Sequence, residues 1–326
     1  KTGVWPERKE KMDQPDVMVY LMTGFLDSGK TQFLKFTLEQ DYFQIPGTTL
    51  LILCEEGEEE YGAAGLKKFN IVVERVESQE ELTEEFLKAL DEKHHPERVV
   101  VEYNGMWKVS DFEKLKLPDG WGIEQKLTTV DASTFQMYLT NLKPLFVEMV
   151  RGSELVLFNR CNDIKPLAGY RRSVKVVSPQ AEVIFEDEQG EVENIFENDV
   201  PYDMDAPVIE IRPEDYGIWY VDMMEHPDKY KGKVVEYTAK VLKPRSFPSK
   251  TFLPGRMAMT CCADDTTFLG YICKSAYAPK LKPGQWVKVR AKIGFARMAL
   301  YRGTGPVLEA ENVEMADPIE ELVYFN

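Results

Sequence analysis

The sequence predicts an α/β domain with a mostly parallel sheet, followed by a small β-barrel of the OB type. Short, nearly continuous apolar runs, such as residues 48–54 and 98–102, are typical of parallel strands that are buried on both faces. Helical patterns separate these runs up to about residue 180, as in a βαβ fold. After residue 230, five short strands with turn signals between them predict the barrel.

We expect four segments in this chain of 326 residues, which is long enough for two domains. Residues 1–16 form a charged N-terminal arm, and residues 17–200 form the α/β domain. A linker punctuated by prolines covers residues 201–213, and residues 214–326 form the barrel domain.

The first predicted strand, residues 17–22, leads into a glycine-rich octet and then a helix over residues 32–38. The octet reads Gly24-Phe25-Leu26-Asp27-Ser28-Gly29-Lys30-Thr31 and fits the phosphate-binding pattern G-x-x-x-x-G-K-[ST]. In such a loop, backbone N–H groups and the lysine hold phosphate oxygens, while the Thr31 hydroxyl binds Mg²⁺. We therefore predict a P-loop NTPase fold in which the octet and Gln32 bind a nucleotide. The alternative is an ordinary glycine-rich turn between a strand and a helix.

The second predicted strand, residues 48–54, ends in an acidic run that reads Glu55-Glu56-Gly57-Glu58-Glu59-Glu60. Five carboxylates in six residues repel one another and favour a solvated loop, so a plain surface loop is one interpretation. The other follows from position, because parallel sheets bind ligands beyond the carboxyl ends of their strands. On that interpretation the loop moves between nucleotide states.

A carboxylate also ends the strand predicted for residues 98–102. Glu102 at this position would orient Mg²⁺ or the attacking water beside a phosphate loop. We assign catalytic roles to Lys30, Glu102 and Glu58, and Mg²⁺ ligation to Thr31, Glu55 and Glu102.

The remaining elements of the α/β domain follow from local signals. Ser78, with Glu81 three residues later, predicts a capping box that opens a helix through Lys93. A helix from Ser133 to Val150 should kink at Pro144. The other predicted elements are strands over residues 71–76, 125–130 and 154–158 and a hairpin over residues 181–196.

The barrel domain should begin with a helix from Glu214 to Glu225, stopped by Pro227. Its predicted strands are Lys233–Leu242, Arg256–Cys262, Thr267–Lys274, Gln285–Ile293 and Val307–Met315. Cys261, Cys262, Asp264 and Asp265 could wrap a thiophilic ion such as Zn²⁺ if the second strand ends early. In a regular strand, one cysteine would instead face the core and the other solvent.

Four motifs in order resemble those of the CobW-type GTPases and metallochaperones, the relatives of HypB and UreG. They are the octet at 24–31, the switch-like segment at 54–58, Glu102 to Gly105, and Val130-Asp131-Ala132. The resemblance implies a GTP-binding domain that hydrolyses GTP with Mg²⁺ and acts in metal homeostasis or metal delivery.

Two departures from that family bear on function. The family's metal-transfer motif, C-x-C-C, should follow the switch segment, yet residues 59–75 contain no cysteine. The guanine-reading motif N-K-x-D reads Asn159-Arg160-Cys161-Asn162, with Asp163 next. An amide therefore stands where a carboxylate would accept guanine N–H groups, and the base could be that of GTP, ATP or XTP.

The C-terminal half resembles the C-terminal domain of YcgQ-type proteins, which are associated with permeases. The resemblance rests on His226-Pro227, residues 230–233, residues 255–265 and residues 284–287. It implies a partner that is a permease or a metal-dependent client protein.

Composition narrows the classes of protein. Asp and Glu number 55 against 40 Lys and Arg, so the formal net charge of −15 argues against a nucleic-acid partner. The five cysteines lack disulfide-framework spacing, which indicates a reducing, cytoplasmic compartment. No apolar run predicts a membrane span or a signal peptide.

Two functions follow from the sequence. The first is a Mg²⁺-dependent NTPase of the CobW type. The second is a nucleotide-sensing adapter that binds NTP with little turnover and docks a permease or client protein through its barrel. A small-molecule kinase is disfavoured because no arginine-rich lid follows the strands, and the oligomeric state, a homodimer included, stays open.

Overall fold

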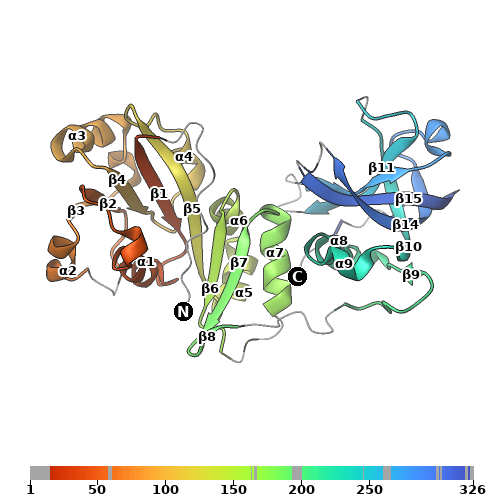
Figure 1. Ribbon diagram of the computed structural model, residues 1–326, viewed down its shortest axis with the longest axis horizontal. Helices are drawn as coiled ribbons and strands as arrows, with labels where there is room; N and C mark the ends of the chain where they lie inside the picture. Colours follow the sequence, from red (N-terminus) through yellow and green to blue (C-terminus); the bar gives the residue numbers. More distant parts are fainter. Residues whose placement is uncertain are drawn as a thin grey trace. The chain divides into compact units, whose positions relative to one another are not determined.

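The computed structural model describes most of the chain as two compact units. The described residues are 15–57, 61–162, 164, 167–192, 200–244, 246–259, 266–298, 301, 303–319 and 322–323. The N-terminal unit comprises Lys1–Leu167 and Val177–Ile195, and the C-terminal unit comprises Ala168–Val176 and Phe196–Asn326 (Figure 1).

An eight-stranded sheet forms the centre of the N-terminal unit, with the order β3-β2-β4-β1-β5-β6-β7-β8. Its strands are β1 (Val17–Thr23), β2 (Thr49–Leu53), β3 (Ile71–Arg75), β4 (Arg98–Glu102), β5 (Trp121–Asp131), β6 (Leu155–Asn159), β7 (Glu182–Asp187) and β8 (Gly190–Glu191). All neighbouring pairs are parallel except β7 and β8. The predicted α/β fold with a mostly parallel sheet is confirmed.

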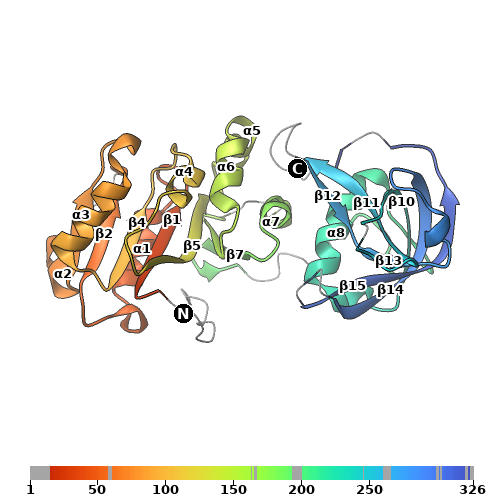
Figure 2. The same ribbon diagram turned by 90° about the horizontal axis from the view of Figure 1, so that it is seen from above.

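Helices cover both faces of this sheet (Figure 2). They are α1 (Lys30–Leu38), α2 (Ala63–Lys68), α3 (Glu84–His94), α4 (Val109–Glu113), α5 (Phe135–Asn141) and α6 (Lys143–Val150). Helix α7 (Leu167–Val177) comes next in the chain. Helix α1 buries Leu34 and Leu38 in one cluster with Met22 and Leu51 of the central strands. On the other face, Phe135 of α5 packs edge-on against β6. Most of α7 belongs to the C-terminal unit.

The capping-box prediction was wrong about where the helix begins. Ser78 does donate to Glu81, at 3.3 Å, but this pair closes only a 3₁₀ turn over Gln79–Glu81. Helix α3 begins at Glu84, and Thr83 is its N-cap because the Thr83 hydroxyl accepts from the Phe86 N–H at 3.2 Å. The two signals lie five residues apart, and only the second satisfies a helical N–H.

The predicted kink at Pro144 is instead a break between two helices. Leu142 leaves the helical conformation, with φ −129° and ψ 32°, and α6 starts at Lys143. Pro144 then lies in the first turn of α6, where its missing N–H removes no intrahelical hydrogen bond.

Five strands of the C-terminal unit close into a ring, in the order β10-β11-β13-β15-β14 and back to β10. They are β10 (Val234–Leu242), β11 (Thr251–Met259), β13 (Ile272–Lys274), β15 (Gly303–Met315) and β14 (Trp286–Met298). Strand β12 (Thr266–Gly270) extends β11, and β9 (Ile209–Glu210) extends β10. Among these strand pairs, β13–β15 and β9–β10 are parallel and the others are antiparallel. The predicted small closed barrel is confirmed.

Several boundaries in the barrel differ from expectation, and β14 and β15 both extend beyond the predicted strands. Strand β11 begins at Thr251 rather than Arg256, because Pro254-Gly255 continues the strand. A Cβ at Gly255 would lie 2.2 Å from the Leu269 carbonyl oxygen of β12, so glycine permits this close pairing. The third predicted strand divides at Tyr271 into β12 and β13. After α8 (Tyr216–Glu225), Pro227 opens a further short helix, α9 (Pro227–Tyr230).

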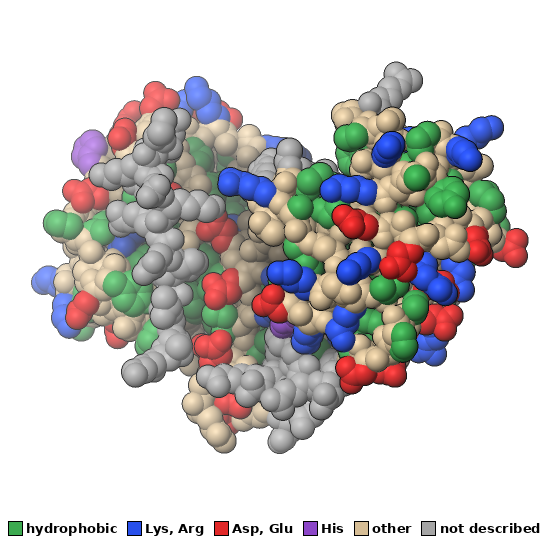
Figure 3. All heavy atoms as spheres, turned by 45° about the vertical axis from the view of Figure 1, so that its right-hand side comes forward, with side chains coloured by type: hydrophobic (Ala, Val, Ile, Leu, Met, Phe, Trp, Pro, Cys, Tyr) green, Lys and Arg blue, Asp and Glu red, His purple; other side chains and the backbone are tan. Residues whose placement is uncertain are grey.

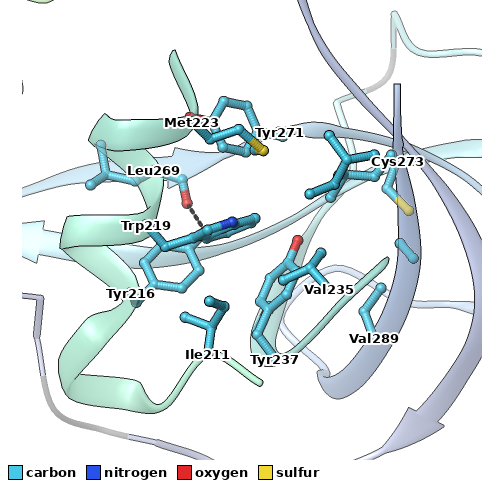
Figure 4. Packing of buried hydrophobic residues seen from close by; sticks show 14 of the residues in the cluster. Ile211, Tyr216, Trp219, Met223, Val235, Tyr237, Leu269, Tyr271, Cys273 and Val289 are labelled. Atoms are coloured by element: carbon cyan, nitrogen blue, oxygen red, sulfur yellow. Dashed lines mark hydrogen bonds between the residues drawn. The ribbon is translucent and has the colours of Figure 1, made fainter. Parts of the chain in front are cut away.

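The barrel core is aromatic (Figure 4). Trp219 of α8 is fully buried, with ring centroids 5.4 Å from Tyr216, 4.7 Å from Tyr237 and 5.6 Å from Tyr271. The Tyr216 hydroxyl donates to the Leu269 carbonyl oxygen at 3.0 Å, so this buried polar group is satisfied. Burial of such side chains contributes roughly 1.5–3 kcal/mol each and fixes α8 against the barrel.

Charges of both signs are interspersed on the face shown in Figure 3. None of the helices in the described ranges is both long and apolar enough to span a membrane.

Candidate nucleotide-binding site

The loop between β1 and α1 contains backbone conformations with positive φ, which few residue types adopt. Gly24 has φ 145° and Gly29 has φ 92°. A Cβ at Gly24 would lie 2.5 Å from both Ser28 Oγ and the Thr129 carbonyl oxygen, and a Cβ at Gly29 would lie 2.5 Å from Asn159 Nδ2. Both positions therefore require glycine for conformation and for space.

Asp27 also adopts a left-handed conformation, with φ 59°. Asp tolerates this region better than most residues, which gives a physical reason for its presence at this position. Phe25 is buried and stacks on Tyr138 of α5 with ring centroids 4.1 Å apart, whereas Leu26 is exposed. The loop is thus anchored on one side and open on the other.

Gly105, three residues after the end of β4, packs closely against the loop, and the sequence pattern did not predict this contact. A Cβ at Gly105 would lie 2.5 Å from the Gly24 carbonyl oxygen and 2.7 Å from the Phe25 Cα. The missing side chain therefore lets the chain after β4 run directly beneath the loop.

Helix α1 begins at Lys30, with Gly29 as its N-cap, and within the described residues no side chain caps it. The first N–H groups of a helix have no intrahelical partners. Together with the helix dipole, they favour an anion at this end. This is the arrangement that the octet predicts.

Lys30 is only 3% exposed and turns back into the loop. Its Nζ donates to the Gly24 and Phe25 carbonyl oxygens at 2.9 Å each and forms an ion pair with Glu55. The other carboxylate oxygen of Glu55 accepts from the Gly105 N–H at 3.3 Å. The structure therefore brings together the predicted phosphate lysine and the first residue of the acidic run.

Glu102 is the second carboxylate of the site and is 3% exposed. The Thr31 hydroxyl donates to its Oε1 at 2.5 Å, and the Tyr61 hydroxyl donates to its Oε2 at 2.6 Å. Burial raises the pKa of Glu102, while the Thr31 and Tyr61 hydrogen bonds and the charge of Lys30 oppose the rise. Hydroxyl and carboxylate oxygens are hard donors, so this set fits Mg²⁺.

Tyr61 was missed by sequence reasoning. Burial and the neighbouring Glu102 raise the pKa of Tyr61, so its phenol stays protonated and acts as a donor. The residue comes just after the acidic run and 41 positions before its partner, and no local motif signals such a pair.

The base-motif residues after β6 brace the loop. Asn159 Nδ2 donates to the Ser28 carbonyl oxygen at 2.7 Å, and Arg160 Nη1 donates to the Asp27 carbonyl oxygen at 2.8 Å. Asn159 Oδ1 is buried without a partner in the described part of the chain. One polar atom at this point is therefore left for a ligand to satisfy.

Asp131, at the end of β5, orients Arg160. The two form an ion pair at 2.6 Å, and Asp131 Oδ1 accepts from the Ser133 N–H at 2.8 Å. Burial opposes ionisation, but the hydrogen bonds from Ser133 and Arg160 outweigh it and lower the pKa of Asp131. Asp131 of the V-D-A segment thus acts on the loop indirectly, because it orients the Arg160 side chain that donates to the loop.

A cavity of about 720 Å³ adjoins the loop at Gly29. Its lining includes Gln32, Phe33 and Phe36 of α1 together with Asn162 and Glu186. This volume lies within the range of small-molecule and cofactor pockets. Its position next to the loop is where the base and ribose of a bound nucleotide would extend.

Six of the predicted site residues lie outside the described residues, and the structure does not place them: Glu58, Asp163, Cys261, Cys262, Asp264 and Asp265. Among the residues that are described, no group of three or more His, Cys, Asp or Glu side chains could hold a metal ion. Cys54, Cys161 and Cys273 are free, buried thiols. Burial raises the pKa of Cys273 to about 12, which makes it an unreactive part of the barrel core.

The strand order and the loop geometry together define the first unit as a P-loop α/β fold, joined to a small β-barrel unit. Residues 188–325 match the family model of the DUF1980 C-terminal domain. That match covers the barrel and the segment leading to it. No match was found among the curated proteins.

Three solved structures show low similarity. Hydrogenase maturation factor HypB from Archaeoglobus fulgidus is 17% identical, with 53% of this chain and 83% of that chain covered and a TM-score of 0.37. Zn(II)-bound YjiA GTPase from E. coli is 14% identical, with 79% and 89% covered and a TM-score of 0.43. The single-stranded DNA binding protein Rim1 from S. cerevisiae is 8% identical, with 26% and 95% covered and a TM-score of 0.18. Scores of this size add nothing to what the strand order and the loop geometry show by themselves.

Proposed function

We propose that this protein is a Mg²⁺-dependent nucleoside triphosphatase of the CobW type that hydrolyses GTP and acts in metal homeostasis or metal delivery. The observation that carries the proposal is the glycine-bent loop at the uncapped start of α1, with Lys30 turned inward. An anion placed there meets N–H donors, the helix dipole and an ammonium group.

Each side chain of the site has a role in this proposal. The first-turn N–H groups and Lys30 bind and orient the phosphates, and Asn159 and Arg160 keep the loop in its shape. Thr31 and Glu102 would hold Mg²⁺, which when bound neutralises charge on the phosphate oxygens. Tyr61 holds Glu102 in position from the opposite side.

Glu55 gives the site a way to respond to the nucleotide. Lys30 contacts two carbonyl oxygens and Glu55, so a phosphate group has to displace one of these acceptors. Release of Glu55 would move the start of the acidic run at 55–60. This is the proposed signal to a partner, and we place the protein in the cytoplasm.

The experiment is phosphate release from GTP by the full chain with Mg²⁺, measured for the native protein and two variants. Lys30→Ala should abolish release, because it removes the buried phosphate ligand. Lys88→Ala on the exposed face of α3 is the matched control and should keep native activity. Equal release by the native protein and Lys30→Ala contradicts the hydrolase proposal.

A second candidate is the nucleotide-sensing adapter, which docks a permease or client protein through its barrel. The observation that favours it is the absence of cysteine from residues 59–75, where the CobW family carries its metal-transfer motif. A single-turnover assay beside a metal analysis of the purified protein separates the two. Tight nucleotide without turnover and without metal supports the adapter, and thiophilic metal released on hydrolysis supports the first proposal.

A further inference from the structure

The β7–β8 hairpin contributes a wall of the cavity beside the loop. Ile184 of β7 packs on the cluster that contains Leu34 and Phe33 of α1. Side chains alternate along a strand, so Glu186, two residues further on, lies on this same face. Since β7 ends at Asp187, Glu186 stands at the carboxyl end of the strand and lines the cavity.

Asn162, which stands at the base-reading position of the sequence motif, has its oxygen engaged elsewhere. Its Oδ1 accepts from the Glu188 backbone N–H at 3.4 Å. A backbone N–H can only donate, so the oxygen and not the nitrogen of the amide faces the hairpin. Asn162 thus uses its oxygen to brace the hairpin, and as a neutral amide it has no second acceptor oxygen for a base that presents two N–H groups.

Among the described residues that line the cavity, Glu186 supplies a carboxylate with two acceptor oxygens. Its side chain is half-buried, and its carboxylate has no hydrogen bond or ion pair within the described residues. Burial raises the pKa of Glu186, and the nearby Glu191 adds to the rise. Phe33, Phe36 and Leu157 provide apolar walls in the same cavity, as a flat aromatic ligand requires.

On the basis of the proposed function, we propose that Glu186 is the residue that reads the base, and that it selects guanine. The two oxygens of a carboxylate can accept from two neighbouring N–H groups at once. Guanine presents such a pair, a ring N–H beside an amino group. Asn162, in the position of the motif carboxylate, is a positioning residue for the hairpin.

The other purines fit this acceptor less well. Xanthine carries a carbonyl oxygen where guanine has its amino group, and that oxygen would face a carboxylate oxygen. Adenine carries an unprotonated ring nitrogen next to its amino group, which gives the same repulsion. Inosine lacks the amino group and keeps only one of the two hydrogen bonds. The expected order of affinity is GTP, then ITP, then XTP and ATP.

The test is displacement of a fluorescent GDP derivative from the full chain by GTP, ITP, XTP, ATP and inorganic tripolyphosphate. Glu186→Gln should lower the affinity for GTP by about tenfold to a hundredfold, which corresponds to the free energy of hydrogen bonds to a charged group. It should also narrow the preference for GTP over XTP, since glutamine can donate to the xanthine oxygen. Tripolyphosphate, which has no base, should have the same inhibition constant for the native protein and Glu186→Gln once the affinity of each protein for the guanine-bearing probe is taken into account.

Two further variants complete the design. Glu182→Gln, at the exposed start of β7, should leave every affinity unchanged. Asn162→Asp should not increase the GTP to XTP ratio, because residue 162 faces the hairpin amide. An increase with Asn162→Asp, or an unchanged ratio with Glu186→Gln, overturns the assignment of Glu186.

The outcomes also separate this inference from the proposed function. Tripolyphosphate and GTP that bind in a Lys30-dependent manner, with no effect of Glu186→Gln on selectivity, refute only the role of Glu186. Failure of every triphosphate to displace the probe, or displacement that Lys30→Ala leaves unchanged, overturns both proposals.

Discussion

Substitution of Glu55 by glutamine tests whether this carboxylate competes with the nucleotide for Lys30. In the structure, Glu55 forms an ion pair with Lys30 and accepts from the Gly105 N–H. The lysine and glutamate side chains are 2% and 8% exposed, so water screens this pair only weakly. Glutamine has nearly the same shape, and it keeps a neutral acceptor while removing the charge.

The magnitude follows from the strength of charged hydrogen bonds. Such a bond stabilises a protein by about 1.5–3 kcal/mol, against about 0.5–1 kcal/mol for a neutral one, so the substitution costs the protein without nucleotide about 1–2 kcal/mol. In the nucleotide complex, a phosphate group takes the place of Glu55 at Lys30. The substitution therefore destabilises the complex less than it destabilises the protein without nucleotide. By linkage, nucleotide affinity should rise by about five- to thirtyfold.

The assay is equilibrium binding of GTP without Mg²⁺, so that any ligation of the metal by Glu55 does not enter. Thermal unfolding of the nucleotide-free protein provides a second readout. A loss of 1–2 kcal/mol should lower the Tm of a unit of this size by about 2–8 °C. Glu56→Gln is the control, because the Glu56 side chain is 87% exposed and, as far as the structure describes the chain, pairs with Arg75 at the surface.

Glu55→Gln should lower the Tm of the protein without nucleotide and raise its affinity for GTP. A lower Tm without nucleotide and a tighter complex with nucleotide agree with the competition. Unchanged or weaker binding of GTP by Glu55→Gln, with Glu56→Gln also unchanged, refutes the idea that Glu55 occupies the place of a phosphate.

Two further substitutions test the loop and the Mg²⁺ side of the site. Gly29→Ala should destabilise the protein by about 2–4 kcal/mol, because it combines a left-handed strain of about 1–3 kcal/mol with a clash at Asn159. Denaturant unfolding measures the loss, and Gly152→Ala, with φ 75° and nothing within 4 Å of the new Cβ, should cost only the strain. Tyr61→Phe removes one hydrogen bond that opposes the raised pKa of Glu102, so that pKa should rise further. Because Glu102 ionises on the alkaline side of its pKa, the acid limb of the Mg²⁺-dependent pH–rate profile should shift to higher pH. Loss of activity at all pH values without such a shift would argue against a role of Tyr61 through Glu102.

Burial of Glu102 also sets the sign of a stability effect. Its pKa is raised in the folded state, so folding favours the protonated form. The stability from this group is complete below the unfolded pKa of about 4.3 and is lost as pH rises through the folded pKa. The Thr31 and Tyr61 hydrogen bonds limit this loss, since both donate to the ionised carboxylate.

The sequence predicted the sheet well where the strands are buried on both faces. Strand β4 covers Arg98–Glu102 as expected, because an apolar run between two turn signals has few alternatives. Helix starts were less predictable, since Ser78 and Thr83 both carry capping signals and only packing decides between them. Strand β9, with two residues, has no pattern that periodicity could detect.

In the site, too, the features that depend on local sequence were predictable, and those that depend on contacts between distant residues were not. The octet predicted the loop and the start of α1, because glycine and lysine types at that spacing have a direct physical meaning. The contacts of Tyr61 and Gly105 with partners far away in the chain, and the place of Glu186 in the cavity lining, depend on which strands are neighbours. Arg160 combines both kinds of information. The motif predicts that it belongs to the base-reading segment, but only the structure shows that its side chain contacts the loop backbone.

The most direct test of a polyphosphate site around Lys30 is equilibrium binding of GTP with Mg²⁺ to the native full chain, Lys30→Ala and Lys88→Ala. The account predicts saturable binding by the native protein and Lys88→Ala, and an affinity lower by about tenfold to a hundredfold for Lys30→Ala, which loses a charged hydrogen-bond donor to phosphate. Absence of binding by the native protein, or the same affinity for all three proteins, would contradict it.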